Sequence, residues 1–227
     1  MNGGAEPTTM LILLPSCIGM SATILLNLSA IRKGTIQWKY LLLVTFTELI
    51  SSILTFHGLT DAGSAIFTVA YCSVTIFTAF FASIFLGRKL CMMQWMGIFT
   101  VTFGLTIVLI GSEHEGTKVT YGIVLILLGA LLHSLSYVIS EYLLIVSDDP
   151  IAPEYLCTLL GLLSGSINII WQIIYTIPRF DVLVTDKILQ HHGNAQVVSV
   201  VYLLLIWIAF TNSASFYTII GRFGRYQ

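Results

Sequence analysis

The sequence predicts an all-α fold, a polytopic membrane bundle of about seven spanning helices. Hydrophobic residues make up 56% of the 227 positions and charged residues only 9%, whereas soluble domains average about 25% charged residues. The apolar residues also occur in long blocks, and a helix needs about 20 of them to cross the hydrocarbon core. Most charges lie between these blocks, so we expect the chain to be surrounded by a lipid bilayer.

The spans follow one another with short connections, and we expect a single membrane transporter domain over residues 1–227. The second and third spans are separated only by Thr60–Gly63, which predicts a tight antiparallel hairpin. Asp148-Asp149-Pro150 and Pro153 separate the fifth helix from the sixth. Residues 178–196 form the longest connection and are predicted to be polar. The expected spans are residues 10–31, 40–59, 64–87, 93–111, 120–145, 155–177 and 197–220.

The distribution of Lys and Arg predicts the orientation. One side of the predicted bundle carries Arg32, Lys33, Lys39, Arg88, Lys89, Arg222 and Arg225, and the other carries Lys118, Arg179 and Lys187. Cytoplasmic loops are the more positive ones in membrane proteins. The first side is therefore predicted to be cytosolic, with residue 1 outside or in a lumen and residue 227 in the cytosol.

Glycines recur at helical spacing in three spans. Gly97, Gly104 and Gly111 repeat every seven residues in the fourth span, and Gly116, Gly122 and Gly129 nearly do so in the fifth. The sixth span contains the small-xxx-small pattern Gly161–Gly165. Such residues let helix backbones approach closely in lipid. The glycine series of the fourth span therefore predicts a densely packed helix pair.

Polar side chains at membrane depth are the candidate functional residues. Glu48 lies near the middle of the second span, and Ser51 and Thr55 fall within about 60° of it around the helix. A carboxylate at the bilayer centre costs about 2.5–3.5 kcal/mol, so it should face protein or water. The fifth and sixth spans also have polar faces. The predicted cavity-lining, substrate-binding residues are Glu48, Tyr71, His133, Tyr137, Glu141, Asn168 and Gln172.

Two interpretations of these residues remain open. They could hold helices together through hydrogen bonds of about 0.6 kcal/mol each, or they could line a water-filled cavity. In the second case Glu48 or Glu141 could also couple transport to protons. No Lys or Arg lies deep within a predicted span, so no fixed cation is expected for an anionic solute.

Residues 64–111 resemble the drug/metabolite transporter superfamily, and within it the nucleotide-sugar-transporter-like solute carriers. The resemblance rests on Ser64-Ala65-Ile66-Phe67, on the segment from Thr75 to Leu90 that ends Leu86-Gly87-Arg88-Lys89-Leu90, and on Gln94-Trp95-Met96-Gly97 with Gly104. The family fold has ten helices in two inverted five-helix repeats around a central cavity, with both termini cytosolic.

The resemblance also implies a correspondence of helices. If the Gly87-Arg88-Lys89 turn is the family's fourth-to-fifth connection, the present spans are its second to eighth helices. Residue 1 is then luminal and residue 227 cytosolic, as the charges predict. The first, ninth and tenth helices have no counterpart, so the chain would be partial or would complete its repeat as a homodimer. The basic residues that hold phosphates in relatives belong to the later helices and are not carried over.

The expected function is transport of a small polar metabolite, nucleotide-sugar-like or related, by alternating access. An endomembrane location in the Golgi or the endoplasmic reticulum is expected, with the plasma membrane as the alternative. A non-transporting membrane adaptor or a truncated transporter remnant is the second hypothesis. A seven-helix receptor is less well supported, because the sequence has no Asp-Arg-Tyr or Asn-Pro-x-x-Tyr motif.

Other classes are disfavoured. We expect no enzyme, because His-Glu-x-x-His and Gly-x-Ser-x-Gly are missing from the sequence. No nucleic-acid partner is expected, since there is no basic run. We expect no cofactor, and no metal, because the four cysteines show no metal-type spacing.

Overall fold

The computed structural model describes residues 6–28, 36–112, 116–146, 151–190 and 195–223, and these are helical with short turns and contain no strand. Within them, helices long and apolar enough to cross a membrane cover Trp38–Ala62, Ser64–Phe85, Thr117–Ile145, Pro153–Arg179 and Gln196–Ile219. Leu13–Leu26 and Met92–Ile107 are shorter apolar helices. Each predicted span coincides with one of these segments, so the all-α, multi-pass membrane fold is confirmed.

The contacts divide the chain into two compact units. One contains Trp38–Tyr142, and the other contains Met1–Gln37 together with Leu143–Gln227. They are called the central unit and the terminal unit below, and each is described by itself. The prediction of one domain over residues 1–227 stays a prediction.

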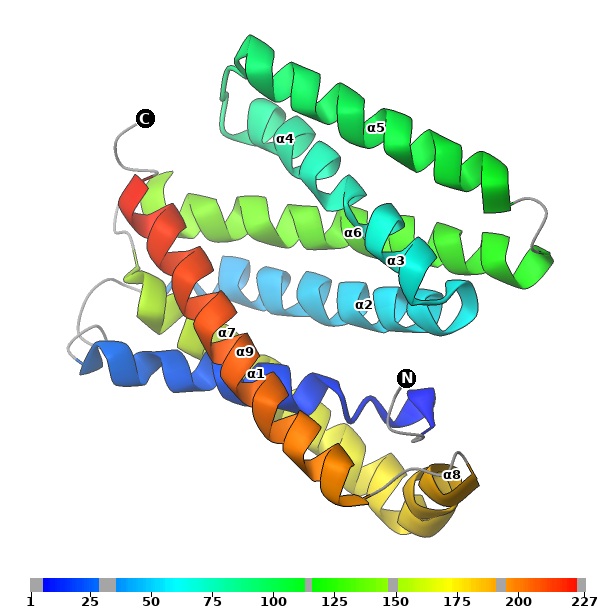
Figure 1. Ribbon diagram of the computed structural model, residues 1–227. Helices are drawn as coiled ribbons and strands as arrows, with labels where there is room; N and C mark the ends of the chain where they lie inside the picture. The colour runs from blue at the N-terminus through cyan, green and yellow to red at the C-terminus, as the bar shows by residue number, and fades with distance from the viewer. Residues whose placement is uncertain (1–5, 29–35, 113–115, 147–150, 191–194, 224–227) are drawn as a thin grey trace. The chain divides into compact units, whose positions relative to one another are not determined.

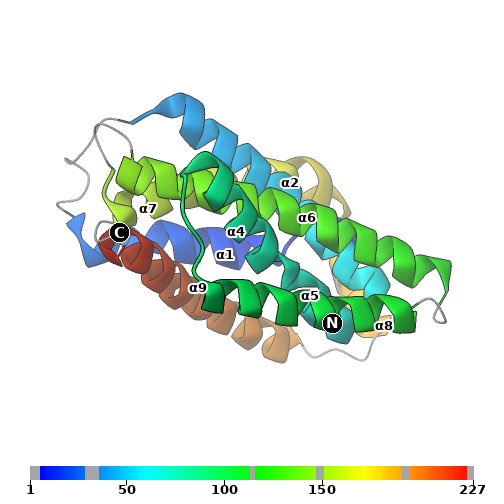
Figure 2. The same cartoon turned by 90° about the horizontal axis from the view of Figure 1, so that it is seen from above.

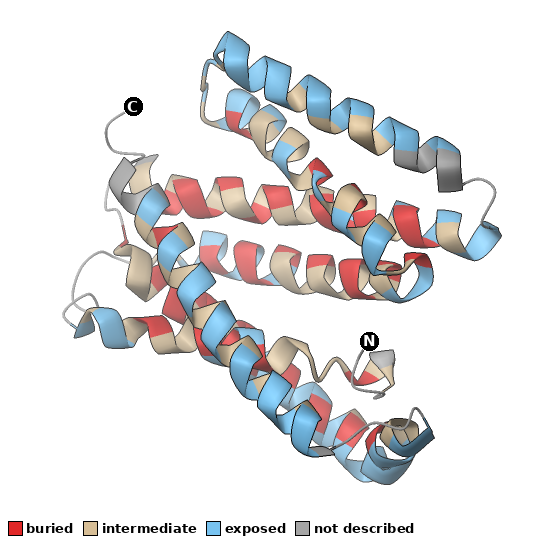
Figure 3. Ribbon diagram, in the orientation of Figure 1, coloured by how far each residue is buried: buried red, intermediate tan, exposed pale blue. Residues whose placement is uncertain are grey.

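The central unit is built around a pair of long helices, α2 (Trp38–Ala62) and α6 (Thr117–Glu141). They pack side by side, as both views show (Figures 1 and 2). Their buried residues face each other, whereas α5 (Met92–Ser112) is largely exposed (Figure 3). The α2–α6 pair is therefore the core on which the other helices of this unit lie.

The third predicted span consists of two helices, α3 (Ser64–Tyr71) and α4 (Ser73–Phe85). Gly63, with φ of 81°, turns the chain directly from α2 into α3, so the predicted short turn is confirmed. At Cys72 the N–H bonds to Val69 O at 3.2 Å, a tight 3₁₀-type turn that separates the helices. The predicted hairpin holds only near Gly63, because α4 packs mainly on α6 instead of α2.

The glycine prediction for the fourth span is wrong. A Cβ placed on Gly97 or Gly104 of α5 would meet no described atom within 4 Å, and the surroundings of Gly111 lie outside the described residues. The close packing is between α2 and α6. A Cβ on Gly129 would lie 2.5 Å from Thr55 Cγ2, and one on Gly122 would lie 2.7 Å from Ala62 N. Glycines spaced seven residues apart thus occur in both α5 and α6, but only those of α6 lie against another helix.

The terminal unit packs α1 (Leu13–Ser21) against both α7 (Pro153–Trp171) and α9 (Ala195–Phe223). A Cβ on Gly161 would lie 2.6 Å from Ser21 N, and one on Gly165 would lie 3.3 Å from Cys17 Cβ. The small-xxx-small pattern of the sixth span therefore forms a helix contact, as predicted. Pro153 begins α7, where its missing N–H costs nothing.

The predicted polar connection of residues 178–196 is mostly helical. After α7 come a π-helical turn (Gln172–Thr176), a 3₁₀ turn (Ile177–Arg179), a second π-helical turn (Asp181–Thr185) and α8 (Asp186–Gln190). Of its apolar side chains Val184 is buried, whereas Phe180, Val182 and Leu189 are exposed. Some residues used in the predictions lie outside the described residues or have side chains that are not described: Arg32, Lys33, Asp148, Asp149, Pro150, Arg222 and Arg225.

Candidate functional site

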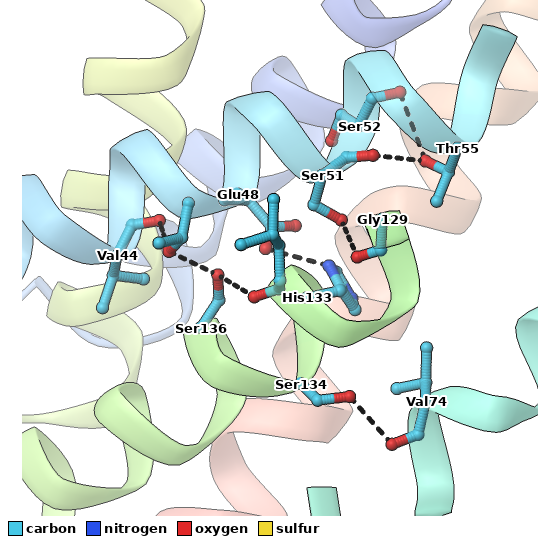
Figure 4. Close-up of polar contacts among 12 residues, drawn as sticks. Val44, Glu48, Ser51, Ser52, Thr55, Val74, Gly129, His133, Ser134 and Ser136 are labelled. Atoms are coloured by element: carbon cyan, nitrogen blue, oxygen red, sulfur yellow. Dashed lines mark hydrogen bonds and ion pairs between the residues drawn. The ribbon is translucent and has the colours of Figure 1, made fainter. Parts of the chain in front are cut away.

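Glu48 of α2 faces His133 of α6 in the centre of the central unit. The Nδ1 atom of His133 lies 3.0 Å from Oε2 of Glu48, and the two side chains are 12% and 25% exposed (Figure 4). The pair therefore links two different helices, α2 and α6. The carboxylate is thus neither directed into lipid without a partner nor fully enclosed.

Two hydrogen bonds flank this pair along the same helix interface. The hydroxyls of Thr47 and Ser136 share a hydrogen bond of 2.7 Å, and the Ser51 hydroxyl donates to Gly129 O at 2.8 Å (Figure 4). The Ser51 bond is possible because Gly129 carries no side chain, so the backbones approach closely. These contacts set the register of α2 against α6 and so position Glu48 opposite His133.

Aromatic residues surround His133. The Tyr137 ring meets it edge-on with centroids 4.3 Å apart, and Tyr71 of α3 lies at 5.9 Å. Phe67 stacks on Tyr71 at 5.2 Å. The structure thus brings together Glu48, Tyr71, His133 and Tyr137, which we call the Glu48 cluster. Its chemistry is one carboxylate, one imidazole and two phenols, groups that can hydrogen-bond and stack on a polar solute.

Glu141 lies at a different place on α6 and has a different partner. It follows His133 by eight residues, which is about 12 Å along a helix. It forms an ion pair with Arg88, which lies between α4 and α5; the Glu141 and Arg88 side chains are 10% and 35% exposed. Sequence reasoning used the Gly87-Arg88-Lys89 turn only for topology and missed this pairing. The available signal was a carboxylate at membrane depth with no Lys or Arg three or four residues away in the same helix.

Asn168 and Gln172 form a separate polar cluster in the terminal unit. Both are buried, and Gln172 Nε2 donates to Asn168 Oδ1 at 3.1 Å and to Thr9 O at 2.7 Å. Trp171 Nε1 donates to Thr8 O at 3.2 Å, and the Tyr175 hydroxyl donates to Thr8 Oγ1 at 3.3 Å. These amides thus tie α7 to the segment before α1, as the helix-joining interpretation expects.

The Gln172 region nevertheless keeps polar capacity. Gln172 Oε1 and Thr176 Oγ1 are buried and have no hydrogen-bond partner among the described residues. They lie in the π-helical turn Gln172–Thr176, and such turns often occur at functional sites. The described residues contain no group of three or more His, Cys, Asp and Glu side chains that could hold a metal ion.

A comparison with known protein families gives a match over the first half of the chain. Residues 4–110 match the sequence profile of the EamA-like transporter family, part of the drug/metabolite transporter superfamily. The match covers somewhat less than half of the 227 residues and ends within α5, the helix that the sequence resemblance equates with the family's fifth. No curated protein matches the chain significantly. The match supports the superfamily resemblance, and the nucleotide-sugar-transporter-like subtype remains a prediction.

Proposed function

Starting from the similarity to EamA-like transporters, we propose that this multi-pass membrane protein carries a small polar metabolite across the bilayer by alternating access. The solute class is a nucleotide sugar or a related hydroxylated metabolite, and the location is an endomembrane of the Golgi or the endoplasmic reticulum. The observation that supports the proposal most is the Glu48–His133 pair at 3.0 Å inside an apolar span.

The pair is an expensive way to join two helices. A carboxylate within a span costs about 2.5–3.5 kcal/mol, whereas a neutral amide could form a similar hydrogen bond at lower cost. Thr47–Ser136 and Ser51–Gly129 already join α2 and α6 at the same level. The partial exposure of Glu48 also leaves it open to a solute. A solute-binding role accounts for the charge better than packing does.

The Glu48 cluster offers a hydroxylated solute several contacts. Glu48 accepts hydrogen bonds from hydroxyl groups, and the phenols of Tyr71 and Tyr137 supply donors and ring faces against which a sugar or a base can stack. Asn168 and Gln172 are proposed to contribute amide contacts in the terminal unit. Glu141 is proposed as a second carboxylate of the pathway, exchanging Arg88 for solute contacts.

Replacing Glu48 by glutamine should lower solute uptake about tenfold to a hundredfold, the loss expected for a hydrogen bond to a charged group of about 1.5–3 kcal/mol. Uptake is measured in proteoliposomes with labelled nucleotide sugars, free sugars and amines. Glu154→Gln is the matched control, since Glu154 is a carboxylate in the first turn of α7 and belongs to the terminal unit, whereas the Glu48 cluster belongs to the central unit. Its uptake should equal that of the natural chain.

Two results would count against the proposal in different ways. If the natural chain, folded in the vesicles, moves none of these solutes, the adaptor or remnant hypothesis is favoured. If it transports and Glu48→Gln transports equally well, the cluster is only a packing feature.

A proton gradient should drive uptake through Glu48 and His133 if this pair exchanges its proton during the cycle. His133→Gln is then expected to lose the response to an imposed pH gradient while keeping solute exchange without a gradient. The measurement is uptake with and without an inward proton gradient. An unchanged gradient response in His133→Gln would exclude the pair from coupling.

A further inference from the structure

The terminal unit contains an apolar groove of about 450 Å³, within the size range of small-molecule sites, about 300–1,000 Å³. Three segments form it: Leu11, which lies two residues before α1, the helical stretch after α7, and the first turns of α9. Buried Val184 lies at its base, and Leu203, which is exposed, belongs to its rim. The lining residues are Leu11, Phe180, Val184, Ile188, Val198, Ser199, Tyr202 and Leu203.

The groove lies where two membrane spans end. Phe180 directly follows the span that ends at Arg179, and Val198 is near the start of the span that begins at Gln196. Charged residues mark the polar boundary beside it, since Lys187 Nζ lies 3.5 Å from Glu6 Oε2. The groove therefore lies at the depth where lipid headgroups give way to acyl chains.

The rim continues into an exposed apolar stripe along α9. Val200, Leu203, Leu204 and Trp207 are all exposed, and their spacing of three and four residues places them on one helix face. An extended hydrocarbon chain can thus follow the groove and then the stripe. Water is a poor occupant, because apolar cavities with few polar partners stay dry.

We propose that this groove binds one acyl chain of a membrane phospholipid. The selectivity is for the chain and not for the headgroup, because the nearby cations already have partners. Lys187 pairs with Glu6, and the Arg179 guanidinium lies 5.3 Å from the centre of the Tyr175 ring. Asp181 and Asp186 add negative charge to the same stretch. An anionic headgroup therefore gains no advantage over a zwitterionic one. The proposal does not depend on transport activity.

The test uses the whole chain in phosphatidylcholine vesicles that contain phosphatidylcholine with a photoreactive diazirine in its acyl chain. After illumination, mass spectrometry should locate the label on residues 180–188 and 198–203. Phosphatidylglycerol with the same chain should label these residues equally. Val198→Trp should lower this labelling about tenfold, as when a bulky ring takes the space of a few buried methylene groups.

The matched control is Val201→Trp, since Val201 is on the same helix, is exposed and does not line the groove. Its labelling should stay unchanged. Ser199→Phe fills the groove from its rim and should reproduce the loss if Val198→Trp fails to fold by circular dichroism. Two results would show ordinary surrounding lipid and overturn the proposal. One is label spread evenly along α9, and the other is labelling of Val198→Trp and Ser199→Phe equal to that of the natural chain. Labelling by a photoreactive free fatty acid alone, or occupation by a second copy seen as crosslinked dimers without lipid label, would also overturn it.

Discussion

Gly129→Leu should separate α2 from α6 and destabilise the central unit by at least about 3 kcal/mol, the upper range for an overpacked core. Even a single added carbon at Gly129 would lie 2.5 Å from Thr55 Cγ2 and 3.0 Å from Ser51 O. A backbone oxygen cannot move aside as a flexible side chain can. The leucine would also displace the Ser51 hydroxyl from Gly129 O. The measurement is the thermal unfolding temperature in detergent, with the fraction of monodisperse protein.

The same change at Gly104 is the control. Gly104 is also within an apolar helix and belongs to a series of glycines spaced seven residues apart. A Cβ placed on it would meet no described atom within 4 Å. Gly104→Leu should leave the unfolding temperature unchanged or raise it slightly, because glycine weakens a helix by about 0.5–1 kcal/mol. Equal losses in both variants would show that glycine itself, and not the close contact with α2, is what these positions require.

Breaking the Arg88–Glu141 pair should cost about 2 kcal/mol. A fully buried pair that loses one partner costs about 3–5 kcal/mol, and the cost here is lower because the Arg88 side chain is 35% exposed. Arg88→Met leaves the carboxylate of Glu141 with no described cation. The connection between α4 and α5 should then loosen, which limited proteolysis and the unfolding temperature both measure.

The double variant separates the pair from its surroundings. Arg88→Met combined with Glu141→Gln removes both charges, so its stability should lie close to that of Glu141→Gln alone and above that of Arg88→Met. Such a non-additive result is the signature of a direct interaction. Strictly additive losses would mean that Arg88 and Glu141 act independently, and the ion pair would contribute nothing measurable.

The spans were predictable because crossing a membrane requires a long block of apolar residues, and the length of such a block can be read directly from the sequence. The polar face of α2 was also predictable in part, since the angular positions of Glu48, Ser51 and Thr55 follow from helix geometry alone. The partner of each side chain was not. His133 and Glu48 are 85 residues apart, and nothing within either helix indicates that they meet.

The glycines show the same limit more clearly. Gly104 in α5 and Gly129 in α6 have equivalent heptad neighbours in the sequence, but only Gly129 contacts another helix. The difference comes from the turn at Gly63 and the break at Cys72, which lead α3 and α4 across α6. A local pattern can indicate that a helix is able to pack closely, but the path of the whole chain decides where it does.

The hydroxyl contacts at Thr47 and Ser51 restrict how this protein can change shape. Sliding α2 by one turn, about 5.4 Å, would break both bonds and push side chains into the space that Gly129 leaves open. We therefore expect α2 and α6 to move together as one unit if the protein changes conformation. We expect bending to occur outside this helix pair, and the 3₁₀ turn at Cys72, where α3 and α4 meet, is a candidate position for it.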